Sequence, residues 1–324
     1  MSAQAKELFS PIEAPHRAQW QERVSHPPRD LTGINRLRSV VAEGGLHRAV
    51  LLDGAEKDGL LAGALLARRR PRPIVVFAEA TWKVGRNPLD QLATRFGLRM
   101  LDGPHVRYCV LSSRELELFP RTWHVDPARV AFTPYHYTLS PAELKDARPG
   151  DGSLFTGGVS LRDYGTLVEA MRSVSSPLTI ATRGRPRWAR QVPATVTVRE
   201  TTPREYNELT AAASVVVVPL ELRDDRSAGQ ATYLNAMALG KAVVVSDVAG
   251  ARDHVRDGET GVLVPPGDPE RMALALNTLL ADRGYARRLG QAAREDVLAR
   301  FGPDRYVERL LEVVDDALAG APAG

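Results

Sequence analysis

The sequence of 324 residues contains a single cysteine, few aromatic residues and no long apolar run. One cysteine excludes an internal disulfide and a cysteine-rich metal site. Cys109 lies in the apolar segment VRYCVLS, which indicates a buried thiol. No stretch of about 18 consecutive apolar residues occurs, so the sequence predicts no membrane-spanning helix. The polar N-terminal segment carries no apolar signal core, and we therefore expect a cytoplasmic location.

The net charge of +4 is unevenly distributed. Residues 1–145 carry 21 basic and 15 acidic side chains (+6), and residues 146–324 carry 22 and 24 (−2). A basic half suggests an anionic partner, which could be a phosphorylated acceptor, a membrane surface or nucleic acid. The densest cluster, RRRPR at 68–72, has no interleaved aromatics and no nucleic-acid motif around it. We interpret it as a solvated helix end and expect no nucleic-acid partner.

Apolar runs alternate with helical patterns along the first half. Residues 1–30 are predicted to be a loose arm or an early helix. The expected strands lie at 47–53, 73–79, 106–112 and 129–135, and the expected helices at 56–69 and 87–101. This alternation is typical of a parallel sheet with helices on both faces.

A polar segment rich in Pro and Gly, residues 140–152, is the best linker candidate, and the alternation restarts after it. The expected strands are 153–158, 178–182, 195–200, 214–220, 242–247 and 261–266. The expected helices are 163–174, 203–213, 231–240 and 269–282, followed by two closing helical stretches. The sequence therefore predicts two α/β domains, 1–146 and 147–324, each a doubly wound Rossmann-like sheet. Ligands of such sheets bind beyond the carboxyl ends of the strands, here in a cleft between the domains.

Four ordered segments of the second half carry a specific pattern. They are FTGG with LRDYGTLVEA, YNELTAAASVVVVPL, SAGQATYLNAMALGKAVVVSD and GARDHVRDGETGVLVPPGDPERMALAL. Together, over roughly residues 150–315, they resemble the C-terminal domain of family 4 glycosyltransferases. The resemblance implies a GT-B fold, in which 1–146 is the acceptor-side domain and 147–324 binds a nucleotide sugar. It also allows the last helix to pack back on the N-terminal domain.

The resemblance implies an enzyme that moves a sugar from a nucleoside diphosphate donor to a small-molecule or lipid-like acceptor. It further implies retention of the anomeric configuration without a metal or other cofactor. The sequence agrees, because it shows no DxD-type pair at a strand end and no histidine cluster of ligand spacing. The adjacent pair Asp224-Asp225 is either a metal or sugar contact or a solvated turn.

The donor-site expectations follow from the same segments. Gly157 and Gly158 would form a tight turn at which the donor approaches the backbone. Arg162 resembles the basic residue that grips the diphosphate, and we expect it to be catalytic through charge stabilisation. Arg183, at a strand end, is expected to contact base or phosphate. The segment Val198–Glu200 is expected to hold the base, with Arg199 among the contacts.

The turn before the helix at 231–240 is the expected site for the diphosphate and sugar hydroxyls, since a helix N-terminus binds anions. Its residues are Ser227, Ala228, Gly229 and Gln230. Asn235 stands where the family usually places the second Glu of its E-x7-E pattern, and Ser227 stands in place of the first. Asn can still hydrogen-bond ribose hydroxyls. The loss of both glutamates leaves open whether catalysis is altered or abolished.

The N-terminal half resembles the acceptor domain by architecture alone. Glu79, after an expected strand, is the candidate contact to the reacting sugar. Trp82 is either a platform that stacks on an acceptor ring or a core aromatic. Lys83 and His136 are further acceptor-side candidates, although a structural role for His136 is an equal alternative.

Two other readings stay open. The chain could be a degenerate, non-catalytic glycosyltransferase-like partner subunit, or a GT-B nucleotide-sugar epimerase. A phosphorylase is disfavoured, because no lysine stands in a cofactor-anchoring context. Contact of the basic N-terminal half with a membrane surface is the remaining partner prediction.

Overall fold

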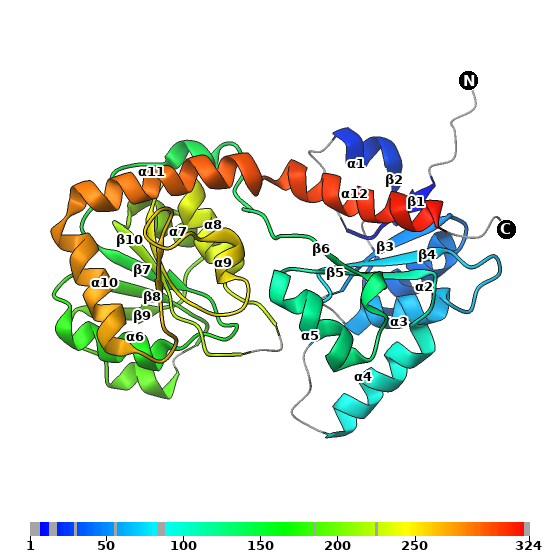
Figure 1. The fold of residues 1–324 in the computed structure, drawn as a ribbon, viewed down its shortest axis with the longest axis horizontal. Helices are drawn as coiled ribbons and strands as arrows, with labels where there is room; N and C mark the ends of the chain where they lie inside the picture. Colours follow the sequence, from blue (N-terminus) through cyan, green and yellow to red (C-terminus); the bar gives the residue numbers. More distant parts are fainter. Residues whose placement is uncertain are drawn as a thin grey trace. The chain divides into compact units, whose positions relative to one another are not determined.

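The structure is a computed structural model that describes residues 7–12, 18–28, 31–54, 57–82, 88–184, 186–223 and 226–320. The chain forms two compact units, Met1–Pro134 with Asp304–Gly324, and Tyr135–Pro303. Each unit contains one parallel six-stranded sheet with helices on its faces (Figure 1). The prediction of two doubly wound α/β sheets is therefore confirmed.

The first unit has the strand order β2-β1-β3-β4-β5-β6. Its strands are β1 (Leu8–Phe9), β2 (Val24–Ser25), β3 (Ala49–Asp53), β4 (Ile74–Ala78), β5 (Val106–Val110) and β6 (Val130–Phe132). Its helices are α1 (Ala18–Arg23), α2 (Gly33–Gly44), α3 (Lys57–Leu66), α4 (Pro88–Leu101), α5 (Ser113–Trp123) and the short 3-10 turn Pro127–Arg129.

The second unit has the order β12-β11-β10-β7-β8-β9. Its strands are β7 (Leu154–Gly157), β8 (Leu178–Ala181), β9 (Val196–Arg199), β10 (Val215–Val218), β11 (Ala242–Ser246) and β12 (Val262–Val264). Its helices are α6 (Tyr164–Ala170), α7 (Pro203–Ala212), α8 (Gln230–Ala238), α9 (Ala251–His254), α10 (Pro269–Ala281) and α11 (Arg283–Arg300). Short 3-10 turns lie at Glu143–Asp146, Met171–Ser173 and Arg187–Arg190.

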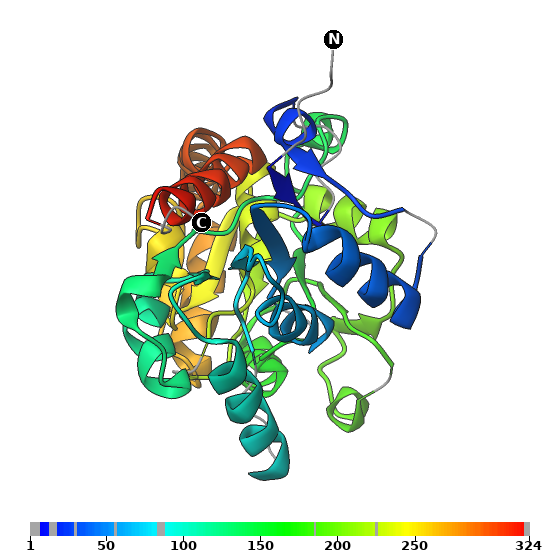
Figure 2. The same cartoon turned by 90° about the vertical axis from the view of Figure 1, so that its right-hand side faces the viewer.

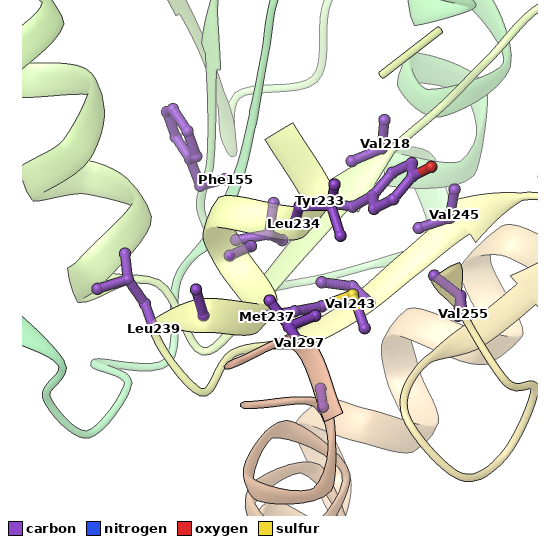
Figure 3. Packing of buried hydrophobic residues seen from close by; sticks show 14 of the residues in the cluster. Phe155, Val218, Tyr233, Leu234, Met237, Leu239, Val243, Val245, Val255 and Val297 are labelled. Carbon is purple, nitrogen blue, oxygen red and sulfur yellow. The ribbon is translucent and has the colours of Figure 1, made fainter. Parts of the chain in front are cut away.

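Both faces of each sheet are buried, which explains the continuous apolar runs of the central strands. In β10, Val216 and Val218 enter one core cluster, and Val215 and Val217 enter the cluster on the opposite face. Figure 3 shows Val218 of the first cluster with Tyr233 and Leu234 of α8 and other apolar residues. The sheet is therefore held between two apolar layers, and its strand ends are placed rigidly.

The last helix, α12 (Pro303–Ala319), belongs almost wholly to the first unit. Its buried residues, among them Tyr306 and Val314, share a core cluster with Leu8, Trp20 and Leu51. The structure divides the chain after Pro134, so the linker candidate at 140–152 lies inside the second unit. It runs there along the N-terminal ends of the central strands, and Asp151 N donates to Ala212 O (3.0 Å).

Within the first 30 residues the expected early helix is present as α1, and the described part of this segment also adds two strands, β1 and β2, that the sequence did not predict. β1 pairs with both β2 and β3, through two residue pairs in each case. Strands of two residues are too short to show a periodic pattern in the sequence. Among the described residues, no helix has both the length and the apolar character needed to cross a membrane.

Candidate functional site

The second sheet reverses its strand order between β7 and β10. In such sheets ligands bind beyond the carboxyl ends of the strands at the point of reversal. The loops that follow the two strands are joined by main-chain hydrogen bonds. Asp163 N donates to Pro219 O (3.1 Å), and Glu221 N donates to Leu161 O (3.0 Å). The loop after β7 and the loop before α8 are therefore held together as one surface.

Gly157 and Gly158 form the turn at the end of β7. A Cβ on Gly157 would lie 2.3 Å from Tyr206 Cε2, so only glycine fits there. Gly158 has a φ of +108°, which side chains rarely adopt. Its carbonyl accepts a hydrogen bond from Tyr164 Oη (2.6 Å). The turn is thus fixed from two sides and exposes main chain to an approaching ligand.

Arg162 is anchored inside this surface by three hydrogen bonds. Its Nε donates to Gly157 O (2.9 Å), Nη1 to Ser160 O (2.9 Å) and Nη2 to Thr232 Oγ1 (3.0 Å). Burial lowers the pKa of the guanidinium, against the raising influence of nearby tyrosines, but an arginine remains charged at neutral pH. Among the described residues, no carboxylate forms an ion pair with it. Arg162 therefore holds an uncompensated positive charge beside the first turn of α8.

The N-terminus of α8 lies at the same place. Gly229 is its N-cap residue with φ +82°, and as a glycine it supplies no capping side chain. A Cβ on Gly229 would come within 2.9 Å of Val218 Cγ1. Gln230 Nε2 donates to Ser227 Oγ (3.1 Å), and both side chains are buried. The helix dipole at this N-terminus, next to Arg162, makes the turn suited to an anion such as a diphosphate.

Asn235 is engaged within its own unit. Its Oδ1 accepts from Thr138 N (2.7 Å), and its Nδ2 donates to Thr138 Oγ1 (2.9 Å). The side chain is 8% exposed. These contacts leave one amide N–H of Asn235 for a ligand hydroxyl.

Arg183 follows β8, and Arg199 is the last residue of β9. Both residues lie at the same edge of the sheet. Arg183 is exposed. Arg199 is exposed and pairs with Glu205 (3.3 Å), whose carboxylate also completes the capping box of α7 with Thr202. Glu200 accepts a hydrogen bond from Gly184 N (2.6 Å), which joins the loop after β8 to the end of β9.

Three residues that sequence reasoning missed complete the surroundings of Arg162. Tyr206 Oη lies 3.1 Å from Thr232 Oγ1, and its ring packs edge-on against Phe155. Tyr164 bonds to the Gly158 carbonyl, as described above. Thr232 lies within the first turn of α8, on the side facing Arg162, and that helical position was the one signal available.

In the first unit, Glu79 follows β4 with a φ of +54°, unusual for a residue with a side chain. Tyr306 Oη of α12 donates to its carboxylate (3.3 Å). Burial, together with the neighbouring charge of Asp53, raises the pKa of Glu79 to about 7, and the Tyr306 hydrogen bond lowers it slightly. Backbone strain and a shifted pKa at a strand end are features common at functional sites.

The remaining acceptor-side candidates have different positions. Trp82 is 7% exposed and packs against Phe77, Tyr108, Phe119 and Trp123. These contacts correspond to the alternative of a core aromatic rather than a platform that stacks on an acceptor ring. Lys83 lies outside the described residues. His136 is half-buried in the second unit, where its Nδ1 donates to Tyr137 O (2.7 Å).

A cavity of about 300 Å³ opens where the first sheet reverses its order, between β1 and β3. Its polar lining includes Asp53 at the end of β3, Asp58 of α3, and Thr32 and Arg36 of α2. Arg36 Nη2 donates to Pro11 O (3.1 Å). Sequence reasoning missed this site, although Asp53 directly follows a buried strand and is followed by Gly54.

Comparison with known proteins shows which proteins this segment resembles. Residues 152–282 match the family model of glycosyl transferases group 1. That segment contains β7, Arg162 and α8. This part of the chain is therefore similar to the group 1 glycosyl transferases. Among the described residues, no cluster of three or more His, Cys, Asp or Glu side chains could hold a metal ion.

Curated relatives match part of the chain. The chain is 38% identical over 123 residues to alpha-maltose-1-phosphate synthase of Mycolicibacterium smegmatis, covering 36% of this chain and 31% of that protein. It is 37% identical over 109 residues to D-inositol 3-phosphate glycosyltransferase of Streptomyces bingchenggensis, covering 34% of this chain and 23% of that protein. The matches thus span about a third or less of these relatives' length.

Solved structures share the fold of the whole chain. Anabaena HepE, in complex with UDP and glucose, superposes with a TM-score of 0.69 at 13% identity, covering 98% of this chain and all (100%) of that one. Sucrose-phosphate synthase from Thermosynechococcus elongatus gives a TM-score of 0.67 at 21% identity, covering 92% and 84%. The predicted GT-B fold is confirmed.

Proposed function

We propose that the protein transfers a sugar from a nucleoside diphosphate sugar to a small-molecule or lipid-like acceptor. The observation that carries the proposal is the group 1 segment whose Arg162, without an ion-pair partner among the described residues, lies beside the N-terminus of α8. Related folds have been determined with UDP-glucose and with UDP and glucose. A donor of this class fits a site built from a cation, helix N–H groups and two close-approach glycines.

The chemistry asks little of a protein base. The bond between the anomeric carbon and the diphosphate oxygen breaks, the acceptor oxygen bonds to that carbon, and the acceptor proton passes to the leaving diphosphate. Negative charge grows on the leaving group in the transition state, so Arg162 and the α8 N–H groups lower the barrier. We propose retention of configuration and no metal requirement, since the charge that a metal would supply is present in Arg162.

Acceptor binding is proposed for the polar cavity of the first unit. Asp53, Asp58 and Thr32 offer oxygen acceptors, and Arg36 a cationic donor, in a volume of about 300 Å³. Such a lining suits a hydroxyl-rich small molecule better than an apolar chain. Glu79, beside Asp53, is the proposed contact to the reacting sugar.

A thermal-shift screen of the purified chain against UDP, GDP, ADP, dTDP and CDP, with and without EDTA, tests the donor assignment. The matching nucleotide should stabilise the fold by roughly 2–4 kcal/mol at 100 to 1,000 times its Kd, by mass action. EDTA should not alter this shift. A shift abolished by EDTA would contradict metal independence, and no shift with any nucleotide would contradict the donor site.

The degenerate-partner alternative has one observation in its favour. Ser227 and Asn235 replace both motif glutamates, and both are buried, with Asn235 bonded to Thr138. Product analysis by mass spectrometry and NMR, with sugar donors of the stabilising nucleotide, separates the alternatives, since NMR distinguishes epimers of equal mass. Transfer to an acceptor supports the transferase, isomerised donor without acceptor supports an epimerase, and nucleotide binding without turnover supports a partner subunit.

We also propose that the first unit contacts an anionic membrane surface through α4. This helix exposes Leu92 (65%), Phe96 (65%) and Met100 (43%), which are spaced by four residues and therefore lie on one face. The exposed Arg95 and Arg99 alternate with them. Figure 2 shows α4, in cyan, at the periphery of its unit. Apolar residues flanked by cations suit an interface with acidic lipids.

Co-sedimentation with phosphatidylglycerol vesicles tests this contact. Phe96→Ser should weaken binding by about tenfold or more, because burying an aromatic side chain contributes roughly 1.5–3 kcal/mol. Leu274→Ser on α10 of the second unit, where Leu274 is 59% exposed, is the matched control. Equal binding of all three proteins, or equal binding to phosphatidylcholine, would contradict the assignment.

A further inference from the structure

The second unit contains a second cavity, of about 330 Å³, at the opposite edge of its sheet from Arg162. It is lined by the residues that immediately precede three neighbouring strands. Gly150 and Gly152 precede β7, Ser214 precedes β10, and Lys241 precedes β11. The junction of α10 and α11 closes the other side.

Four cations line this cavity: Arg148, Lys241, Arg283 and Arg287. No carboxylate is among the lining residues that the structure describes. Arg283 and Arg287, both exposed, project from the first turns of α11, and neither has an ion-pair partner within the described part of the chain. Asp151 lies close by in sequence, but its carboxylate accepts hydrogen bonds from Ser153 N (2.8 Å) and Oγ (2.6 Å).

Lys241 is 3% exposed, and its Nζ donates to Arg148 O (2.6 Å). Burial and the charge of Arg148 lower the pKa of Lys241 to about 8, despite the opposing charge of Asp151. Lys241 and Arg148 repel each other, and Arg283 and Arg287 bring two more cations to the same cavity, while Asp151 supplies one negative charge nearby. The excess of positive charge is electrostatically unfavourable unless a further anion joins it. Four like charges therefore line one cavity, and solvation of surface side chains alone does not explain that arrangement.

We propose that this cavity binds the phosphate group of a small molecule. Guanidinium groups donate paired N–H bonds to phosphate oxygens, and a lysine supplies a compact point charge. The volume is of the size that small-molecule sites have. The strands between the two edges have four or five residues, so this site lies about 13–17 Å from the donor crevice, at ~3.3 Å per residue. The ligand is therefore distinct from the sugar donor, and the inference does not depend on the proposed function.

Calorimetric titration of the full chain with inorganic phosphate and with glycerol 3-phosphate, at constant ionic strength in chloride, tests the site. Three variants accompany the wild type. Arg283→Gln with Arg287→Gln removes the two unpaired cations, Arg288→Gln is a matched control on the next position of α11, and Arg162→Gln removes the donor-site cation. Far-UV circular dichroism confirms that each variant is folded.

The double variant should raise the Kd by about tenfold or more, because two charge-assisted contacts are lost. The Arg288→Gln protein should stay within about twofold of the wild type. In Arg162→Gln any phosphate bound beside α8 is lost, and the binding event that remains should keep its Kd within about twofold. Tighter binding of glycerol 3-phosphate than of phosphate would identify a phosphomonoester ligand, and equal binding would identify free phosphate. Absent binding in the wild type, equal binding in all variants, or loss only in Arg162→Gln would overturn the proposal.

Discussion

The side chain of Arg162 both fixes the structure around it and supplies a positive charge. Its Nε and Nη1 bond to carbonyls of its own loop, and its Nη2 bonds to the first turn of α8. The first two bonds fix the glycine turn after β7, and the third joins that turn to the helix N-terminus. The positive charge is therefore delivered in a fixed position, and no reorganisation is needed when a diphosphate arrives.

The replaced glutamates alter the site chemically rather than removing it. Ser227 and Gln230 bond to each other at the start of α8, and Asn235 bonds to Thr138. A neutral serine and amide remove the two negative charges that the family pattern would place near the donor. We expect the net attraction for a diphosphate to be greater for that reason, and the hydrogen bonding to sugar hydroxyls to be poorer.

Glu79 gives a pH prediction. Its pKa is raised from the usual 4.5 to about 7, chiefly by burial. Between these values the folded chain holds a proton that the unfolded chain releases, so the free energy of unfolding falls as the pH rises through this window. The glutamine side chain of the Glu79→Gln variant cannot ionise, so its free energy of unfolding does not decline through this window. Relative to the wild type, the variant should gain about 1–3 kcal/mol between about pH 5 and pH 8.

Urea unfolding at the two pH values measures this difference. Glu117→Gln, on the exposed side of α5 in the same unit, is the matched control. The same relative gain in both variants, or none in Glu79→Gln, would show that Glu79 does not carry the shifted proton.

At the scale of elements, the end of β7 is tightly constrained. Tyr206 of α7 occupies the space that a Cβ on Gly157 would need. Tyr206 in turn contacts Phe155 of β7 and Thr232 of α8. β7, α7 and α8 thus pack together around Gly157, and the conformation of the turn after β7 depends on that packing.

Two glycine-to-alanine changes should therefore have opposite signs. Gly157→Ala should destabilise the fold by about 1–3 kcal/mol through overpacking. Gly97→Ala, in the middle of α4, meets only Leu60 Cδ2 at 3.8 Å and should stabilise by about 0.5–1 kcal/mol, as alanine favours helix. Thermal unfolding of both variants gives the measurement. Two variants of equal stability would show that Tyr206 moves aside without cost.

The sequence predicted the central strands and most helices well, but it missed the helices α2 and α5 and the shortest strands. Strands such as β3, β4, β10 and β11 are continuous apolar runs, because both of their faces are buried. β1 and β2 have two residues each, and their pairing depends on tertiary context. The same limit applies to Tyr206 and Thr232, since nothing local in the sequence shows that they converge on Arg162.

At the scale of the whole molecule, two Rossmann-like units contribute different chemistry. The second unit, with the group 1 segment, carries the cationic crevice. The first unit has the polar cavity at its own point of strand reversal, and Glu79 at the end of the neighbouring strand β4. The ordered motifs made the second unit interpretable from sequence. The first unit lacks such motifs, and its cavity came from strand order, which the sequence does not display.

The central claim is that a nucleoside diphosphate binds at Arg162, and calorimetric titration tests it most directly. The nucleotide selected by thermal shift would be titrated into the wild type, Arg162→Ala and the matched Arg172→Ala, which removes an exposed cation paired with Glu169 at the end of α6. Arg162→Ala should raise the Kd by about 10- to 100-fold, as expected for a lost hydrogen bond to a charged group. Arg172→Ala should leave it within about twofold. An unchanged Kd in a folded Arg162→Ala protein would contradict the account.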